Sequence, residues 1–404
     1  MNLYDHQQKV LDDRRRRLML AWEVGTGKTL ALLSLADKHV DRVLIICPKG
    51  LRKQWEAKIR EYGVLMHAHI VTKEEMRRDH AKMSWVNAVI IDEVHHFSGY
   101  RSQMHKALVK YLVRCQPQYV WTGTATPYRS EPFNVWALGV IHGHIPMNWV
   151  AFRDRFYHPR WLGRRMIYEP NVDAESKKAL RAYMDAFTHY VKLEECFDMP
   201  DQVDEEPEEL EENKEQRAER ERIMLEESNH LVRVNALHQI ENGSLKGNEF
   251  REDKQLGCAK YERLVGLAEE HGKLLIFCRY TLQIERLKRA LAWEGRRVYA
   301  LTGENSADHH AVCVEAERDP SCVVLAQISV AAGYELPSFK VVVFASMSYS
   351  YLDWVQARGR VIRGNKLGKH VFLYLLGGEV DRAVLECVRE KRDFDPTKYS
   401  LLGP

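Results

Sequence analysis

Two carboxylates and two imidazoles follow one another directly after an apolar run. Asp92 and Glu93 come after the apolar residues 86–91, and His95 and His96 follow within three positions. A transition-metal site on one element takes ligands at helical spacing, such as i and i+4, or a second cluster elsewhere, whereas these four residues are nearly consecutive. The β-branched run predicts a buried strand, and sites in open α/β sheets form at the carboxyl ends of strands. The four residues alone leave open a metal site, an acid/base pair or one half of a larger site.

A glycine-rich loop upstream indicates a larger site. The sequence WEVGTGKTL (22–30) lies between an apolar run and an amphipathic one, as in a strand–loop–helix unit. Gly25 and Gly27, with Thr26 between them, allow a tight turn that aims backbone N–H groups at phosphate oxygens, beside the positive end of a helix dipole. Trp22 stands where the full phosphate-loop pattern has glycine.

This loop gives roles to the carboxylates. Lys28 would reach the β- and γ-phosphates of a nucleotide, and the Thr29 hydroxyl would hold Mg²⁺. Asp92 would hold the same Mg²⁺ through its waters, and Glu93 would orient and deprotonate the attacking water. His95 would then sense the state of the nucleotide rather than bind a metal.

The second half of the chain carries a group of arginines. The sequence QARGRVIRGN (356–365) places Arg358, Arg360 and Arg363 after an expected helix. Guanidinium groups bind phosphate in a bidentate manner and stabilise charge on a transferring phosphoryl group. Taken alone, the arginines could form a solvated basic turn. Beside a phosphate loop, they favour the arginine-finger half of a divided ATPase site.

The composition describes a globular protein of two domains. The composition, 45% hydrophobic and 29% charged, is that of a globular protein. The chain of 404 residues is too long for one ordinary core and suits two domains. The chain has no run of eighteen apolar residues, so no membrane span is predicted. Its polar N-terminus lacks an apolar export signal. Eight scattered cysteines without C-x-x-C pairs favour a reduced cytoplasm, with neither disulfide nor zinc.

Charge is unevenly distributed along the chain. The net charge is +3, yet residues 201–227 hold 13 acids and 4 bases, so the remainder is basic. A basic body is compatible with a polyanionic partner and equally with an ordinary solvated surface.

Apolar runs alternate with amphipathic segments in both halves. In the first half, strands are expected at 18–22, 42–47, 68–71, 87–92 and 119–123, with helices at 29–38, 50–62 and 102–114. In the second half, strands are expected at 273–278, 296–302, 322–327, 340–346 and 370–376, with helices at 281–294, 308–318, 350–358 and 379–391. The pattern predicts two α/β domains with parallel sheets, 1–197 and 198–404. The acidic segment 211–240 is expected to be helical, with its acids as a solvated face.

These motifs, in this order, resemble those of the superfamily 2 helicase-like ATPases. The resemblance is to Swi/Snf-type double-stranded DNA translocases, in the compact form carried by bacteriophages and prophages. It rests on LYDHQQKVL (3–11), WEVGTGKT (22–29), VLIICPKGLRKQW (43–55), IIDEVHHF (90–97), TGTATPYRSEPFNVWAL (122–138), KLLIFCRY (273–280), AQISVAAGYELP (326–337), QARGRVIRGN (356–365) and GGEVDRAVLECVREK (377–391).

The resemblance implies two RecA-like P-loop lobes that hydrolyse ATP with Mg²⁺ and act on double-stranded or branched DNA. It implies that Tyr4 and Gln7 recognise adenine and that Gln356 contributes to the nucleotide site with Arg360 and Arg363. A monomer in the cytoplasm, that of the bacterial host if the protein is phage-encoded, is expected. Glu335 departs from the family, which usually has Asn or Asp there, and TGTATP leaves open whether Thr124 or Thr126 matters.

Two other functions remain open at this point. One is a DExH-type helicase that unwinds RNA or DNA with a single-stranded tail. The motif at 43–55 and the closing helix at 379–391 argue against it, because both have the Swi/Snf form. The other is a nucleic-acid-binding clamp with vestigial ATPase motifs, which the complete set of catalytic positions disfavours.

Overall fold

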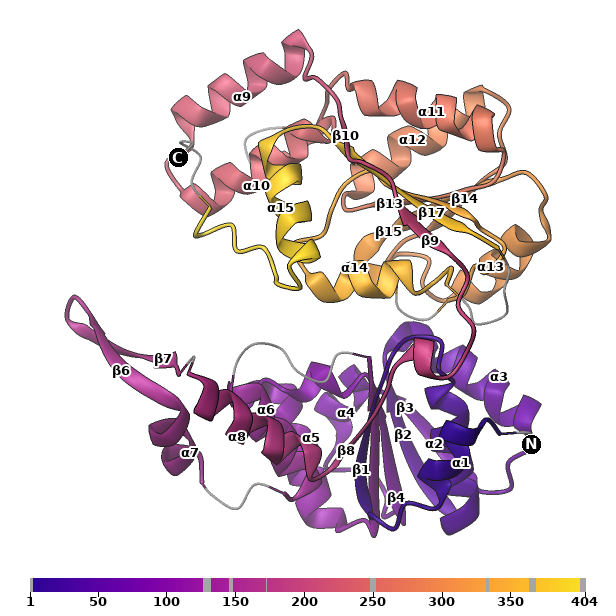
Figure 1. The fold of residues 1–404 in the computed structure, drawn as a ribbon, viewed down its shortest axis with the longest axis vertical. Helices are drawn as coiled ribbons and strands as arrows, with labels where there is room; N and C mark the ends of the chain where they lie inside the picture. Colours follow the sequence, from indigo (N-terminus) through magenta and orange to yellow (C-terminus); the bar gives the residue numbers. More distant parts are fainter. Residues whose placement is uncertain are drawn as a thin grey trace. The chain divides into compact units, whose positions relative to one another are not determined.

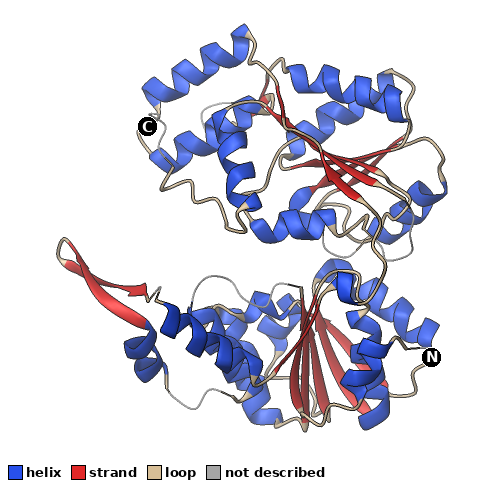
Figure 2. Cartoon of the chain, viewed as in Figure 1, coloured by secondary structure: helices blue, strands red, loops and turns tan. Residues whose placement is uncertain are grey.

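Two compact α/β units make up the chain, Met1–Phe197 and Asp198–Pro404 (Figures 1 and 2). Each is described by itself. The computed structural model describes residues 3–125, 132–144, 148–171, 173–247, 252–331, 334–362 and 368–399. Within these ranges, no helix is both long enough and apolar enough to cross a membrane.

The first unit is built on a six-stranded sheet in which every pairing is parallel. Its order is β3-β2-β4-β5-β1-β8. The strands are β1 Arg17–Trp22, β2 Arg42–Cys47, β3 His67–Thr72, β4 Ala88–Asp92, β5 Tyr119–Thr124 and β8 Thr188–Val191. Sequence analysis predicted the first five strands and missed β8, whose sequence THYV is half polar.

Helices cover both faces of this sheet. They are α1 Asp5–Leu11, α2 Lys28–His39, α3 Arg52–Tyr62, α4 Lys73–Asp79, α5 Gln103–Cys115, α6 Pro132–His142, α7 Trp149–Phe156 and α8 Ala174–Asp185. Alternate residues of β2 enter different cores: Val43 and Ile45 pack with α1–α3, whereas Leu44 and Ile46 pack with α4–α8. Burial on both faces explains why these strands are continuously apolar.

The aromatic and basic stretch 149–168 divides into two parts. In α7, Phe152 and Phe156 are buried in the core of the first unit. The chain then forms an antiparallel hairpin of β6 Tyr157–Leu162 and β7 Arg165–Pro170, which projects from the unit in Figure 1. Trp161 on this hairpin is 69% exposed. Packing therefore accounts for the helical aromatics but leaves the hairpin tryptophan at the surface.

The second unit contains a second sheet whose pairings are all parallel. Its order is β10-β17-β16-β13-β15-β14, and β9 also pairs with β17. The strands are β9 Gln202–Asp204, β10 Glu208–Glu209, β13 Leu274–Cys278, β14 Val298–Leu301, β15 Val323–Gln327, β16 Val341–Phe344 and β17 His370–Leu376. The five longer strands were predicted. The short β9 and β10 lie within the acid-rich residues 201–227 and were not predicted.

The helices of the second unit correct one expectation. They are α9 Lys214–Glu226, α10 His230–Glu241, α11 Ala259–His271, α12 Thr281–Trp293, α13 His309–Arg318, α14 Tyr351–Arg358 and α15 Glu379–Arg389. The acidic segment is helical, but α9 and α10 are separate, and Asn229 caps the second. The prediction that its acids form a solvated face is wrong in part, because Glu219 is buried between Arg222 and Lys254.

Candidate nucleotide site in the first unit and arginine motif in the second

The glycine-rich loop joins the end of β1 to the start of α2. Gly25 and Gly27 have φ angles of 91° and 79°, the left-handed region that favours glycine. Gly27 is the N-cap of α2 and the helix has no side-chain cap, so its first N–H groups are available for an anion. A Cβ on Gly27 would lie 2.4 Å from Nε2 of Gln7, which leaves no room for a side chain.

Residues of α1 hold this loop from the outside. The Gln7 amide donates to the Gly27 carbonyl at 3.2 Å and accepts from the Tyr4 N–H at 3.0 Å. His6 Nε2 lies 2.8 Å from the carbonyl of Thr26, which is itself fully buried. Gln7 and Tyr4 were predicted to lie here, whereas the contact of His6 was missed because no motif assigns it.

Lys28 and Thr29 are the first two residues of α2. The Lys28 ammonium donates to the backbone carbonyls of Trp22 at 2.7 Å and Glu23 at 3.0 Å. A Cβ placed on Gly123, at the end of β5, would lie 3.7 Å from Lys28 Cδ and 3.9 Å from Asp92 Oδ1. Lys28 and Asp92 therefore flank the same glycine, and the strand ends bring the loop and the carboxylates together.

Asp92 is the last residue of β4 and is 9% exposed. Its Oδ2 accepts a hydrogen bond from Trp55 Nε1 at 2.9 Å, and its Oδ1 accepts one from the Glu93 N–H at 3.0 Å. Trp55 lies on α3 within the motif at 43–55. It is the last residue of that motif, and its contact with the site was not predicted. The indole fixes the orientation of this carboxylate.

Glu93 has an unusual backbone and an unsatisfied side chain. Its φ of 52° is rare for a residue other than glycine and is a form of strain common at functional sites. Its Oε2 lies 3.2 Å from His95 Nδ1, but that nitrogen makes its hydrogen bond with Thr124 Oγ1 at 3.1 Å. The buried Oε2 consequently has no hydrogen-bond partner.

The two carboxyl groups are electrostatically distinct. Burial and the negative charge of Glu93 raise the pKa of Asp92 above its usual range. For Glu93, burial acts in the same direction but is outweighed by His95, Lys28 and His96, so its pKa lies below the usual range. The pKa of Asp92 is raised, and Oε2 of Glu93 has no hydrogen-bond partner. Both features fit a divalent cation with its water ligands beside this pair.

His95 connects two motifs. It is 5% exposed, and its contact with Thr124 joins the turn after β4 to the end of β5. Thr124 is thus the threonine that contacts His95, whereas Thr126 lies outside the described residues. His96 is exposed, with its ring 4.3 Å from that of His95.

Trp22, which stands where the phosphate-loop pattern has glycine, contacts β8, the strand that the sequence did not predict. Its ring is fully buried, and Nε1 donates to His189 Nδ1 on β8 at 3.0 Å. The rings of His6 and Trp22 meet edge-on at 5.0 Å. The tryptophan therefore supports the loop from the sheet side rather than entering it.

The arginine motif of the second unit begins within α14. Arg360 is 8% exposed, and its guanidinium donates to the carbonyls of Gln356 at 2.9 Å and Tyr334 at 3.0 Å. Its own carbonyl accepts from the Leu336 N–H at 2.9 Å, so this motif is tied to residues 334–336. Gln356 is buried in α14, whereas Arg363 lies outside the described residues.

Arg358 is the last residue of α14, where the expected helix 350–358 also ends. Its guanidinium pairs with Asp204 on β9 and donates to the Tyr374 hydroxyl at 2.7 Å. It also lies 4.0 Å over the Phe372 ring. These contacts make Arg358 a structural residue that holds β9 against β17.

A buried ionic cluster lies at the start of α15. Asp381 accepts from His238 Nε2 at 2.7 Å and pairs with Lys260 Nζ at 2.5 Å, and all three side chains are fully buried. The Glu241 carboxylate, also fully buried, accepts from the N–H groups of Val380 and Asp381 at 3.1 and 3.0 Å. The cluster thereby joins α10, α11 and α15 within the second unit.

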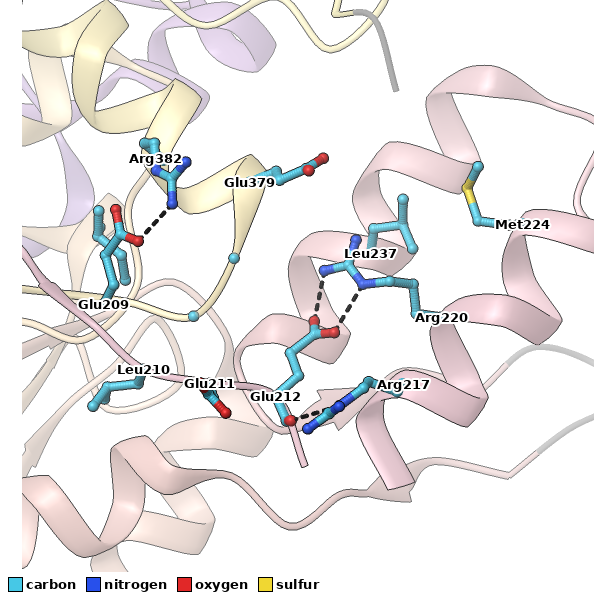
Figure 3. Close-up of a pocket in the computed structure, with 13 residues that line it drawn as sticks. Glu209, Leu210, Glu211, Glu212, Arg217, Arg220, Met224, Leu237, Glu379 and Arg382 are labelled. Carbon is cyan, nitrogen blue, oxygen red and sulfur yellow. Dashed lines mark hydrogen bonds and ion pairs between the residues drawn. The ribbon is translucent and has the colours of Figure 1, made fainter. Parts of the chain in front are cut away.

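A cavity of about 610 Å³ lies beside this cluster (Figure 3). Its three arginines already have partners. Arg220 donates to Glu212 at 2.6 Å and to Glu241 at 2.9 Å, and Arg217 donates to the Glu212 carbonyl at 2.9 Å. Arg382 pairs with Glu209 at 2.6 Å. The lining is thus internally neutralised, and nothing in it favours the nucleotide.

Comparison with known proteins supports a helicase-like chain. Residues 259–365 match the family of the helicase conserved C-terminal domain. The DEAD-box ATP-dependent RNA helicase 5 of Arabidopsis thaliana is 27% identical over 152 residues, which are 36% of this chain and 28% of that protein. The chain thus matches little more than a quarter of that relative's length.

Solved structures extend the likeness to both units. The Hef helicase domain of Pyrococcus furiosus aligns over 96% of this chain and 98% of its own, with a TM-score of 0.53 and 14% identity. The Sulfolobus solfataricus SWI2/SNF2 ATPase core in complex with double-stranded DNA aligns over 96% and 91%, with a TM-score of 0.42 and 19% identity. The prediction of two RecA-like lobes with parallel sheets is confirmed, and residues 259–365 resemble the helicase conserved C-terminal domain.

Proposed function

We propose that this protein is an ATP-dependent motor that moves along or remodels double-stranded or branched DNA. The observation that carries the proposal is the meeting of the glycine-rich loop and Lys28 with Asp92 and Glu93 at one edge of a parallel sheet. A helicase C-terminal domain in the same chain supplies the context.

The residues of the first unit divide the work. Thr29 and Asp92 hold Mg²⁺, and Lys28 with the loop N–H groups binds the phosphates. Glu93 accepts a proton at Oε2 from the attacking water, since that oxygen has no competing hydrogen bond. Gln7 and Tyr4 recognise the base. ATP would supply the γ-phosphoryl group, with ADP as the leaving group, and the bound Mg²⁺ would neutralise part of the phosphate charge.

The second unit contributes Gln356, Arg360 and Arg363. We propose that the two arginines stabilise charge on the transferring phosphoryl group. Arg360 would have to exchange two backbone carbonyls for phosphate oxygens, so its contribution is to the transition state rather than to the resting enzyme.

The choice of DNA rests on the motif at 43–55. Trp55 is a feature of the Swi/Snf resemblance, and its hydrogen bond to Asp92 makes it part of the proposed site. RNA unwinding is the second candidate, because a relative of this chain is an RNA helicase. We also propose that the motor works as a monomer in the cytoplasm.

A profile of ATP turnover distinguishes these candidates. We expect duplex, forked and four-way DNA to stimulate hydrolysis more than single-stranded DNA or RNA. A third strand should be displaced from duplex DNA in an ATP-dependent manner, with little unwinding of long tailed duplexes. Stimulation by RNA alone would support the RNA helicase, and unwinding of tailed DNA without triplex displacement would contradict the translocase. Nucleic-acid binding without turnover would indicate a clamp.

Trp55→Phe is expected to raise the Mg²⁺ concentration needed for half-maximal ATPase activity by about tenfold. The substitution keeps an aromatic ring but removes the donor that orients Asp92, and loss of such supporting partners costs about 10–100-fold in metal affinity or activity. Trp121→Phe is the matched control, because Trp121 is equally buried in the same core. Equal Mg²⁺ requirements for the two variants would contradict a specific role of Trp55.

A further inference from the structure

A second cavity in the first unit lies at the opposite end of β1 from the glycine-rich loop. It measures about 440 Å³ and is lined by Arg15, Arg16, Arg17, Pro117, Gln118, His142, Gly143 and His144. Arg17 begins β1 and Trp22 ends it. Five steps of a parallel strand span about 17 Å, so this cavity is separate from the proposed nucleotide site.

Three arginines line this cavity, and only Arg15 has a carboxylate partner among the described residues. No carboxylate is found among its described lining residues. Arg15 is neutralised by Asp13 at 2.6 Å. Arg17, only partly exposed, donates to the Ile141 carbonyl at 3.1 Å, and burial alone lowers its pKa. The guanidinium of Arg16 is exposed and makes no hydrogen bond or ion pair with the described part of the chain.

Two histidines complete the basic lining. His142 is fully buried, and its ring nitrogens lie 2.8 Å from the Leu138 carbonyl and 3.1 Å from Thr122 Oγ1. His144 stacks on Phe187 at 5.6 Å. Burial, followed by the charges of Arg17 and Arg15, lowers the pKa of His144. The cavity thus has a positive field that disfavours a further cation and favours an anion.

The cavity in the second unit shows how such a lining looks when it is satisfied internally. There, Arg220 and Arg382 each pair with glutamate side chains. Arg16 and Arg17 have no such glutamates. A partly buried guanidinium without a counter-charge is costly to maintain, and an external anion would remove that cost.

We infer that this cavity is a binding site for phosphate groups, with Arg16 and Arg17 as the charged donors and the His144 ring as a further N–H donor. Guanidinium groups present paired N–H donors that match phosphate oxygens. The phosphate can belong to a free small molecule or to the backbone of a nucleic acid. The inference does not depend on the proposed motor function.

Binding of inorganic phosphate to the full chain tests the site directly. Equilibrium dialysis without Mg²⁺ is done in a Lys28→Ala background, which weakens binding at the glycine-rich loop. We expect Arg16→Ala and Arg17→Gln each to weaken the remaining phosphate binding about tenfold or more, since hydrogen bonds to charged groups are the stronger class. Arg14→Ala, in the same arginine run but outside the lining, is expected to bind phosphate as its parent does.

Two further measurements sharpen the result. Phosphate should raise the pKa of His144, because an anion stabilises the imidazolium against the charges of Arg17 and Arg15. Compared at equal concentrations of the phosphate dianion, binding should therefore strengthen as the pH falls. Competition by short duplex DNA, with a salt slope reduced by about one in Arg16→Ala, would identify nucleic acid as the source. Competition by pyrophosphate but not by DNA would identify a small molecule. Unchanged phosphate binding in both Arg16→Ala and Arg17→Gln would overturn the inference.

Discussion

Glu93→Gln is expected to bind ATP as the parent chain does but to hydrolyse it about 10²–10⁴-fold more slowly in the presence of saturating duplex DNA. Glutamine keeps the size of the side chain but cannot accept the proton of the attacking water. The effect should be large because Oε2 of Glu93 is buried and makes no hydrogen bond within the described part of the chain, so it is available to accept this proton. Steady-state turnover and nucleotide binding are measured on the same preparation.

Two further variants make this result interpretable. Lys28→Ala should instead weaken ATP binding, because Lys28 is proposed to contact the phosphates. Glu74→Gln, an exposed glutamate on α4, should leave both quantities unchanged. A Glu93→Gln variant that hydrolyses ATP at the parent rate would remove Glu93 from the role of base.

Asp381→Asn is expected to lower the free energy of unfolding of the second unit by about 3–5 kcal/mol. The substitution leaves the Lys260 ammonium buried without its counter-charge and weakens the contact with His238. Replacing one partner of a fully buried pair costs more than the pair itself contributes, because the remaining charge stays desolvated. Denaturant unfolding of the full chain, followed with a probe in the second unit, measures the effect.

The control and the pH dependence make the Asp381 prediction specific. Glu379→Gln, in the same turn but exposed, should change stability by no more than about 0.5 kcal/mol. Burial raises the pKa of Asp381, but Lys260 and His238 outweigh it and hold the pKa below the usual range. The stabilisation is therefore complete above about pH 4, the unfolded value, and is lost in stronger acid, where the parent and Asp381→Asn should converge. A constant difference at all pH values would contradict this origin.

The longer, apolar strands could be predicted from the sequence, and three short, partly polar strands could not. β2 and β17 match the predicted ranges 42–47 and 370–376, because burial on both faces demands continuous apolar residues. β8, β9 and β10 lie at the edges of their sheets or on a flank of β17. Their short, partly polar sequences carry no such pattern, so only the tertiary structure reveals them.

The candidate site likewise combines contacts that could be predicted from the sequence with contacts that could not. The meeting of Lys28 with Asp92 could be predicted, because the ends of parallel strands share one edge of the sheet. The contacts of Trp55 with Asp92 and of His6 with Thr26 depend on how α3 and α1 pack. No spacing rule encodes those distances. The position of Trp55 in a recognised motif was the one available signal.

The pairing of β9 and β10 with β17 has a consequence for folding and solubility. These short strands, from residues 202–209, cover one flank of β17. An uncovered strand presents a row of free N–H and C=O groups that can recruit another chain and start aggregation. A fragment confined to residues 259–365, the range of the helicase C-terminal match, would lack both β17 and its cover. It would leave β16 as a bare apolar edge, and a fragment that kept β17 but lacked residues 202–209 would expose a flank of β17 instead. We therefore expect a soluble second unit to need both β17 and residues 202–209.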